Sequence, residues 1–459
     1  MTLKFRALLR RLHKSLERFS AMQIITLVFL GIILAGTVLL MLPFASKSGD
    51  SAGFLTAFFT ATSCTCVTGL ALVDTFTHWS GFGQGVMLLL IQIGGLGFMT
   101  IMMIFFFALH RRISLKERIV IAQSFGMDKL SGIVKMVRKV LCRTFVIEGM
   151  GALILTVRFL FQMPVGRAVW CGIFHAISAF CNAGFDILGA VEQGGSLVPY
   201  VSDPIVNLTL MALIVVGGLG FFVWEDILAN RRFRRLSVYS RLVLTISSIL
   251  IFGGAALFAV LEWNNPATIG MMSVEEKLLA ALFQSVTTRT AGFYTVPQGA
   301  LTDAALAVTD LFMFIGGGSG STAGGAKMVT IGVLILSVLA TARGRSRVTV
   351  FRRTISAEQV KNAVAVTVMM FMVVFVTGLF LSLSNALPFR ACFYETVSAL
   401  ATVGLTTGIT TQLNVVSQLI LTVLMFFGRV GIMTISLGFL VSDDVQERYR
   451  YADTKVLIG

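Results

Sequence analysis

The sequence predicts an all-α polytopic membrane protein of four helix–pore-loop–helix repeats, with eight spanning helices and four re-entrant loops around one central pore. The first observation is composition: hydrophobic residues make up 56% of the 459-residue chain and charged residues 13%, about half the charged share of a soluble domain. The second is that apolar runs long enough to cross a bilayer, about 20 residues, recur along the chain. The third is a short glycine-containing segment that recurs four times at nearly constant spacing, which indicates a repeated structural unit.

The four segments share a run of small or polar residues followed by one glycine and one large apolar residue. Their glycines are spaced by 115, 108 and 112 residues. Ser63, Ser178 and Ser398 lie six residues before their glycines, and the third segment has Val286 there, flanked by Ser285 and Thr287. The segments are Thr-Cys-Val-Thr-Gly-Leu (65–70), Phe-Cys-Asn-Ala-Gly-Phe (180–185), Thr-Arg-Thr-Ala-Gly-Phe (288–293) and Leu-Ala-Thr-Val-Gly-Leu (400–405).

Each repeat is expected to run as a spanning helix, a half-helix, a glycine loop and a second spanning helix. The half-helices are too short to cross a membrane, so they are predicted to be re-entrant, which requires burial in protein or contact with water. The predicted elements are 21–44, 51–64, 65–74 and 82–109; then 133–162, 167–180, 181–190 and 203–229; then 240–262, 274–287, 288–296 and 303–342; and finally 360–386, 389–400, 401–411 and 415–440.

The corresponding division of the chain begins with residues 1–20, a basic amphipathic helix expected to lie on the cytoplasmic face. Binding to the inner leaflet of the membrane is its first interpretation, and docking of a soluble partner is the alternative. The remaining parts are repeat one (21–110), repeat two (111–232), repeat three (233–345, containing a glycine-rich stretch at 314–327), repeat four (346–445) and a cytoplasmic tail (446–459).

The net charge of +15 could suggest a nucleic-acid partner, but its distribution favours a membrane. Of the 37 Lys and Arg residues, 29 fall between repeats or at the chain ends, in residues 4–18, 111–143, 231–241, 343–361 and 448–455. Because Lys and Arg mark cytoplasmic loops, both termini are predicted to be cytoplasmic and every glycine segment to approach from outside. Anionic membrane lipid is the expected partner of these basic clusters.

The glycine segments are predicted to form a cation filter. Glycine allows backbone angles that aim a carbonyl where a helix would not, and a ring of carbonyls can replace the hydration shell of a cation. The C-terminal ends of four half-helices would add negative dipole ends at the same place. The candidate potassium-binding residues are Thr68, Gly69, Asn182, Ala183, Gly184, Thr290, Ala291, Gly292, Thr402, Val403 and Gly404.

Charged residues are scarce in and near these segments. Arg289 is the one charged residue within them, so coordination by neutral oxygens is expected. Asp74 and Asp186 follow the first two glycines and are expected in an outer vestibule, where they either attract cations or cap loops. The six cysteines and four histidines show no metal-ligand spacing, so no enzymatic activity and no covalent cofactor are predicted.

A second glycine-rich feature interrupts the last apolar stretch of repeat three. Each glycine inside a helix costs about 1 kcal/mol relative to alanine, so this stretch cannot sustain a helix. A packing kink and a phosphate-binding loop are the alternatives that the residues alone leave open. Arg429 lies inside the last apolar span, where a cation is costly and seldom lacks a role. The residues of the stretch are Gly316, Gly317, Gly318, Ser319, Gly320, Ser321, Thr322, Gly324, Gly325 and Lys327.

Together these features resemble the Trk/Ktr/HKT superfamily of potassium transporters, and most closely the bacterial Ktr-type membrane subunit. The resemblance covers essentially the whole chain and rests on the four glycine segments, on residues 314–327 and on Gly-Arg-Val-Gly at 428–431. Glycine at position 69, where some sodium-selective members have serine, implies potassium permeation. The resemblance also implies that residues 316–325 and Lys327 form an intramembrane gate below the filter, with Arg429 bonded to the gate.

The resemblance further implies potassium uptake across the bacterial inner membrane, influenced by sodium. It implies a homodimer and a cytosolic nucleotide-binding ring that opens the gate. The transported ion is expected to be potassium, with sodium as the other candidate. The alternative function is secondary transport of sodium from a midplane site, although four equivalent parallel repeats favour one central pore over the repeats typical of such transporters.

Overall fold

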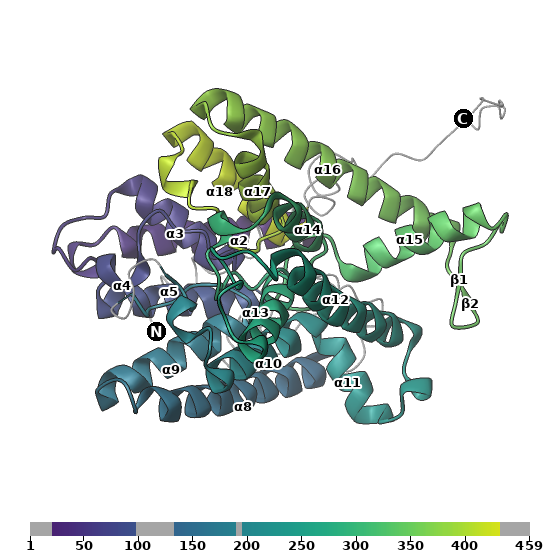
Figure 1. The fold of residues 1–459 in the computed structure, drawn as a ribbon, viewed down its shortest axis with the longest axis horizontal. Coiled ribbons are helices and arrows are strands. Elements are labelled where there is room, and N and C mark those ends of the chain that lie inside the picture. The colour runs from purple at the N-terminus through teal and green to yellow at the C-terminus, as the bar shows by residue number, and fades with distance from the viewer. Residues whose placement is uncertain (1–20, 98–132, 190–194, 432–459) are drawn as a thin grey trace, which may run out of the picture.

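The computed structural model describes residues 21–97, 133–189 and 195–431 (Figure 1). The predicted amphipathic helix 1–20, the end of the first repeat's second helix and the tail 446–459 lie outside the described residues. Within them the chain forms fifteen α-helices, short 3-10 turns and one two-stranded antiparallel hairpin.

The helices fall into four units, defined here by their residues. Unit one (21–97) contains α2 (Ala21–Leu40), α3 (Phe54–Cys66), α4 (Thr75–His78) and α5 (Gly81–Leu96). Unit two (133–230) contains α8 (Ile133–Phe159), α9 (Val165–Phe180), α10 (Pro204–Leu219) and α11 (Phe221–Asn230). The 3-10 turns of these units are η1 (Pro43–Ala45) and η2 (Val198–Tyr200).

Units three and four follow the same order. After η3 (Phe233–Arg235), unit three (238–342) contains α12 (Val238–Glu262), α13 (Val274–Thr287), η4 (Gln298–Ala300), α14 (Asp303–Phe314) and α15 (Met328–Ala342). The hairpin of β1 (Thr349–Val350) and β2 (Arg353–Thr354) leads to unit four (357–431). This unit contains α16 (Ala357–Asn385), α17 (Phe389–Leu400), η5 (Thr410–Gln412) and α18 (Val415–Val430).

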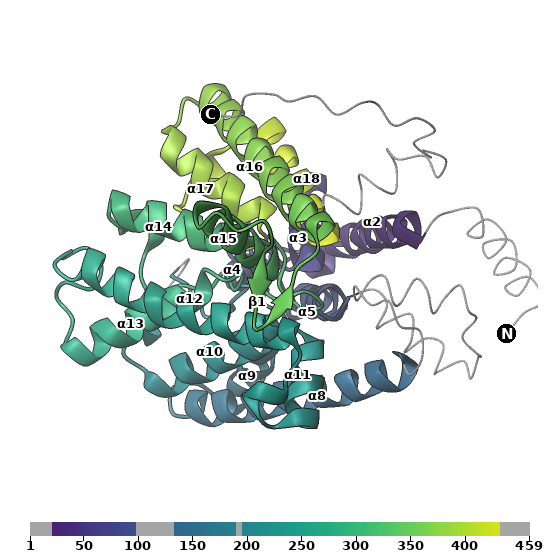
Figure 2. The ribbon, with the colours of Figure 1, turned by 90° about the vertical axis from the view of Figure 1, so that its right-hand side faces the viewer.

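The units are arranged around the centre of the molecule in the order of the chain. Figure 2 looks onto the hairpin side, with α2 and α5 on the right, α8 to α10 at the bottom, α12 to α14 on the left and α16 to α18 at the top. The same order appears in the packing between units: α5 packs against α9, α10 against α13, α14 against α17, and α18 against α3. The second helix of each unit therefore contacts the short helix of the next, and the cycle closes.

Four described helices are long and apolar enough to cross a membrane: Gln23–Leu40, Arg138–Phe159, Val238–Glu262 and Ala357–Asn385. These are the predicted first helices of the repeats. The second helices are shorter or broken. The continuous helix expected over 203–229 is instead two helices, α10 and α11, bent by 93°. Gly220, with φ of +95°, stands at the break, because it adopts a left-handed conformation that would strain other residues.

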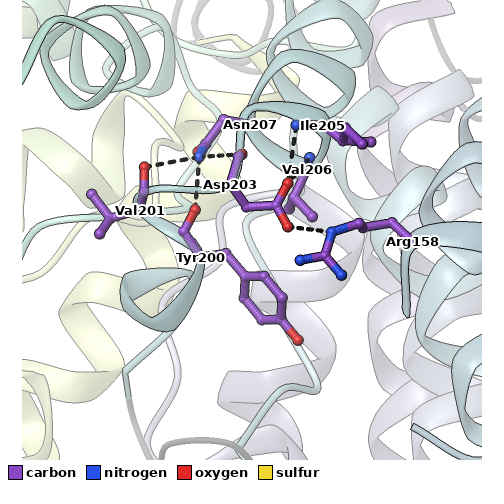
Figure 3. A network of polar contacts seen from close by, with 7 residues as sticks. All are labelled: Arg158, Tyr200, Val201, Asp203, Ile205, Val206 and Asn207. Atoms are coloured by element: carbon purple, nitrogen blue, oxygen red, sulfur yellow. Dashed lines mark hydrogen bonds and ion pairs between the residues drawn. The ribbon is translucent and has the colours of Figure 1, made fainter. Parts of the chain in front are cut away.

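A polar network closes one end of unit two where α8 meets α10 (Figure 3). The Asp203 carboxylate caps α10 by accepting from the amides of Ile205 (3.0 Å) and Val206 (3.2 Å). Its other oxygen lies 2.6 Å from Nε of Arg158 at the end of α8. Asn207 Nδ2 donates to the carbonyls of Tyr200 (2.7 Å) and Asp203 (2.8 Å). One carboxylate thus joins α8 to α10 and satisfies amides in the first turn of α10.

We expect Asp203→Ala to lower the free energy of unfolding by about 1–2 kcal/mol, because a helix cap is lost and Arg158 loses its partner. Asp203→Asn keeps a capping oxygen but no charge, so its effect should be smaller. The measurement is the thermal unfolding midpoint of the purified protein in detergent, with exposed Asp50→Asn as the control. A wild-type midpoint for Asp203→Ala would show that the network contributes no stability.

Candidate functional site

The four predicted glycine segments have one backbone conformation. In each, the residue two positions before the glycine has a left-handed φ between +52° and +65°, and the glycine has a φ between +70° and +97°. A non-glycine residue in this region is uncommon, so four at equivalent positions are unlikely to be coincidence in a sterically restricted backbone. The pairs are Val67 and Gly69, Asn182 and Gly184, Thr290 and Gly292, and Thr402 and Gly404.

Hydroxyl groups hold each segment to the short helix before it. Ser63 Oγ accepts from the Gly69 amide at 3.1 Å, and Ser398 Oγ accepts from the Gly404 amide at 3.0 Å. In the second segment, Ser178 Oγ donates to the Phe185 carbonyl at 2.8 Å. In the third, Thr287 Oγ1 donates to the Phe293 carbonyl. The recurring serine in the sequence is therefore a support for irregular backbone.

The segments meet in a closed ring. A Cβ added to Gly69 would lie 2.6 Å from the Ala183 carbonyl oxygen, and one added to Gly184 would lie 2.8 Å from that of Ala291. A Cβ at Gly292 would lie 2.6 Å from the Val403 oxygen, and one at Gly404 would overlap the Thr68 oxygen. Each glycine thus abuts the residue before the next glycine, in the order one, two, three, four and back to one. All predicted filter residues other than the glycines are buried, at 1% exposed or less: Thr68, Asn182, Ala183, Thr290, Ala291, Thr402 and Val403.

The second helices bring this ring together by close backbone contact. A side chain at Gly94 of α5 would overlap the Thr65 carbonyl, and one at Gly217 of α10 would overlap the Phe180 carbonyl. A side chain at Gly428 of α18 would likewise overlap the Leu400 carbonyl. Each of these carbonyls lies four residues before its filter glycine. The small residues of the second helices therefore fix the distance of the short-helix ends from the centre.

Arg289 and Asp74 bond to groups outside the four segments. The Arg289 guanidinium is buried and donates to Ser247 Oγ on α12 at 2.6 Å, behind the segment that carries it. The Asp74 carboxylate accepts from the Thr77 amide at 2.7 Å and caps α4, which favours the capping interpretation of this residue. Apart from Arg289, the four segments themselves offer only uncharged groups, among them the backbone and hydroxyl oxygens that suit a monovalent cation.

The glycine-rich stretch 316–327 forms a loop between α14 and α15, closed at its base by a parallel bridge between Ile315 and Ala326. One side of the loop bonds to unit two: the Gly318 amide donates to the Gly218 carbonyl at 2.9 Å, and Thr322 Oγ1 donates to the Phe180 carbonyl at 3.1 Å.

The other side of the loop lies against the fourth segment. Gly324 is in close contact with the Thr402 side chain, and a Cβ at Gly325 would lie 3.1 Å from the Ala401 carbonyl. Because Phe180, Ala401 and Thr402 all belong to the filter segments or to the short-helix ends that precede them, the loop is packed directly on the ring.

Arg429 joins the loop to the rest of the ring. Its guanidinium donates to the Thr322 carbonyl of unit three and to the Gly94 and Gly95 carbonyls of unit one, the last at 3.1 Å. Since Arg429 belongs to α18 and Thr322 also bonds to Phe180, all four units meet at these contacts. The planar fork of a guanidinium suits several carbonyl acceptors at once. Lys327 Nζ donates to the Ala323 carbonyl at 2.8 Å, so both cations of the loop region bond backbone oxygens.

Two buried carboxylates near the ring were not singled out from the sequence. Glu395 of α17 accepts from Thr410 Oγ1 at 3.0 Å and from Thr406 Oγ1. Glu148 of α8 accepts from Nε2 of Gln92 on α5, at 3.1 Å to each oxygen. The available signal was the same as for Arg429: each is an isolated charge within an apolar stretch, where ionisable residues are rare and tend to have a function.

The sequence of the chain is similar to those of known proteins over nearly its whole length. The model of the family described as TrkH, cation transport protein, matches residues 5–448. The chain is 38% identical over 448 residues to the potassium/sodium uptake protein NtpJ of Enterococcus hirae, covering 96% of this chain and 98% of that one. It is 39% identical over 442 residues to the Ktr system potassium uptake protein B of Bacillus subtilis, covering 96% and 97%.

A solved structure shares the fold. The crystal structure of the potassium transporter TrkH from Vibrio parahaemolyticus matches with a TM-score of 0.72 over 93% of this chain and 86% of that chain, at 19% sequence identity. The expected helical, polytopic architecture is therefore confirmed at the level of the fold.

We expect Gly217→Ala to destabilise the protein by about 1–3 kcal/mol, because its methyl group would overlap the Phe180 carbonyl in a packed interior. Gly253→Ala on α12 is the matched control: nothing lies within 4 Å of its Cβ position, so it should be neutral or stabilising by up to about 1 kcal/mol. Thermal unfolding in detergent measures both. Equal midpoints for the two variants would contradict the close contact.

Proposed function

Because the chain belongs to the TrkH family of cation transport proteins, we propose that it takes potassium into the cell through a filter made of its four glycine segments. The observation that carries this proposal is the closed ring of four segments with one shared backbone conformation. Four equivalent segments can offer carbonyl oxygens to one ion from all sides, and this arrangement replaces the hydration shell of a cation without a carboxylate.

The proposed architecture is four helix–pore-loop–helix repeats around one pore. The short helices α3, α9, α13 and α17 end at the ring, so their C-terminal dipole ends would lower the energy of a cation there. Each segment contributes a single filter glycine. Few layers of carbonyls would therefore surround the ion, and selectivity between potassium and sodium would rest on how firmly these layers are held.

The loop 316–327 is proposed to be the gate. It packs against the second and fourth segments, and Arg429 binds its Thr322 carbonyl. A guanidinium in a low-dielectric pathway repels a cation while holding the loop across it. Opening would require the bonds of Arg429 and Gly318 to break together, after which the glycines of the loop could adopt other backbone angles at little cost.

The names of the relatives support the proposed regulatory and cellular setting. The Bacillus subtilis and Vibrio alginolyticus proteins are each named as part of a Ktr system, which supports a second, cytosolic component. We assign that role to a nucleotide-binding ring acting on a homodimer of this chain in the bacterial inner membrane, with both termini cytoplasmic. The hairpin β1–β2 and the arginines around it lie on the side proposed to face this ring.

Sodium transport is the second candidate. The relative from Enterococcus hirae is named a potassium/sodium uptake protein, and a ring with few carbonyl layers could admit both ions. Uptake of each ion by cells that lack their own high-affinity potassium uptake would decide between the two, since a potassium filter predicts growth rescue at low potassium and a sodium transporter does not.

The filter proposal predicts that Gly69→Ser lowers the preference for potassium over sodium by about tenfold, because its Cβ would push against the Ala183 carbonyl; this ratio corresponds to about 1.4 kcal/mol of differential binding. Rubidium and sodium uptake into proteoliposomes gives the ratio. Gly53→Ser is the matched control, since Gly53 also has a positive φ but nothing lies within 4 Å of its Cβ position. An unchanged ratio in Gly69→Ser would contradict a filter at this ring.

The gate proposal predicts that Arg429→Gln raises basal potassium flux several-fold, because the charge and most donors to the Thr322 and Gly94 carbonyls are lost. Arg429→Lys keeps the charge without the fork and should lie between Arg429→Gln and wild type. Flux is measured in proteoliposomes without a cytosolic partner. If Arg429→Gln inserts normally and conducts like the wild type, the arginine has a structural role only.

A further inference from the structure

The four short helices carry different residues at the position nine before each filter glycine. This position is Thr60 in α3, His175 in α9, Phe283 in α13 and Glu395 in α17. All four side chains are buried, at 1% exposed or less. The four segments share one backbone conformation, so these different side chains can differ only in how they hold the segment to its short helix.

In the fourth segment the support is a carboxylate. Glu395 accepts hydrogen bonds from the hydroxyl groups of Thr406 and Thr410, the latter at 3.0 Å. Both threonines lie on the turn that directly follows Gly404 and Leu405. Thr406 Oγ1 also accepts from the Gly408 amide at 2.9 Å, so the turn itself is organised around the hydroxyl that Glu395 holds.

The second segment has a weaker version of this support. His175 Nδ1 lies 2.8 Å from the Cys171 carbonyl, and its Nε2 lies 3.5 Å from the Ile187 amide. Together these contacts correspond to the neutral tautomer with the proton on Nδ1, in which Nε2 accepts from the backbone that follows Gly184. One ring thus joins the helix to the exit of its segment.

The other two segments have no such bond at this position, although in the third segment the next residue of α13, Gln284, exchanges two hydrogen bonds with Gln298 after Gly292, at 2.7 and 3.0 Å. The Thr60 hydroxyl has no hydrogen-bond partner in the part of the chain that the structure describes, and Phe283 offers no polar atom. Because the ring runs in the order one, two, three, four, segments two and four face each other across its centre. At the position nine before the glycine, the polar supports therefore lie on segments two and four, and the carboxylate among them is Glu395.

We propose that Glu395 is a positioning residue that sets ion selectivity, by holding the exit of the fourth filter segment so that its carbonyls keep the spacing suited to potassium. It does not touch the ion. Ser398 Oγ accepts from the Gly404 amide, and Glu395 holds the turn that follows, so the backbone around Gly404 is bonded to α17 at two successive points. Hydrogen bonds to a charged acceptor are about twice as strong as those between neutral groups, which suits the task of limiting small displacements. This inference rests on the proposed filter.

The test compares three variants of the full chain in proteoliposomes. Glu395→Gln keeps the shape of the side chain but replaces one accepting carboxylate oxygen with an amide nitrogen that cannot accept. We expect it to lower the ratio of rubidium to sodium uptake by about tenfold, which corresponds to the loss of one charge-assisted hydrogen bond. The double variant Thr406→Val/Thr410→Val removes the same bonds from the turn and should lower the ratio similarly. Thr60→Val, at the equivalent position without a bond, should keep the wild-type ratio.

The uptake ratio separates positioning from a purely structural role, since loss of folded protein lowers the uptake of both ions alike. If Glu395→Gln misfolds, the threonine variant still tests the proposal. Wild-type ratios in the threonine variant or in a folded Glu395→Gln would overturn it, as would an equal change in Thr60→Val. Wild-type protein that shows no preference for rubidium would instead contradict the proposed function.

Discussion

The structure depends on bringing four stretches of non-helical backbone into contact at its centre. The glycine of each segment lies against the carbonyl of the neighbouring segment, and only the absence of a side chain allows this approach. Irregular backbone at membrane depth must be satisfied by protein or lie beside water, since lipid offers no hydrogen bonds. Hydroxyl groups at Ser63, Ser178, Thr287 and Ser398 meet that requirement in all four segments.

The rest of the fold follows from keeping these segments at one distance from the centre. Glycines 94, 217 and 428 let the second helices touch the ends of the short helices, and the same second helices pack against the short helix of the next unit. The loop 316–327 then fills the space next to the ring, where Arg429 ties it to unit one. Because these backbone contacts deform little, a displacement of one unit also displaces its neighbour.

The four glycine segments could be recognised in the sequence because their signal is local. In three of the segments a serine lies six residues before the glycine and bonds to the backbone at or just after it, and all four glycines recur at nearly constant spacing. The break at Gly220 was not predicted, since Gly217, Gly218 and Gly220 also suit close helix packing, and the bend becomes evident only beside the loop that bonds to it. Likewise, the acceptors of Arg429 lie 107 and 335 residues away, and the partners of Glu395 depend on the turn that α17 faces. Contacts between residues so far apart produce no periodic pattern in the sequence.

The most direct test of the account is to locate the ion itself. Crystals of the purified protein grown with rubidium in place of potassium would give anomalous difference density at each bound ion. The account predicts a peak at the centre of the ring, equally distant from the four segments that contain Gly69, Gly184, Gly292 and Gly404. Density confined to another place, such as the surroundings of Asp74 and Asp186, with none inside the ring, would contradict it.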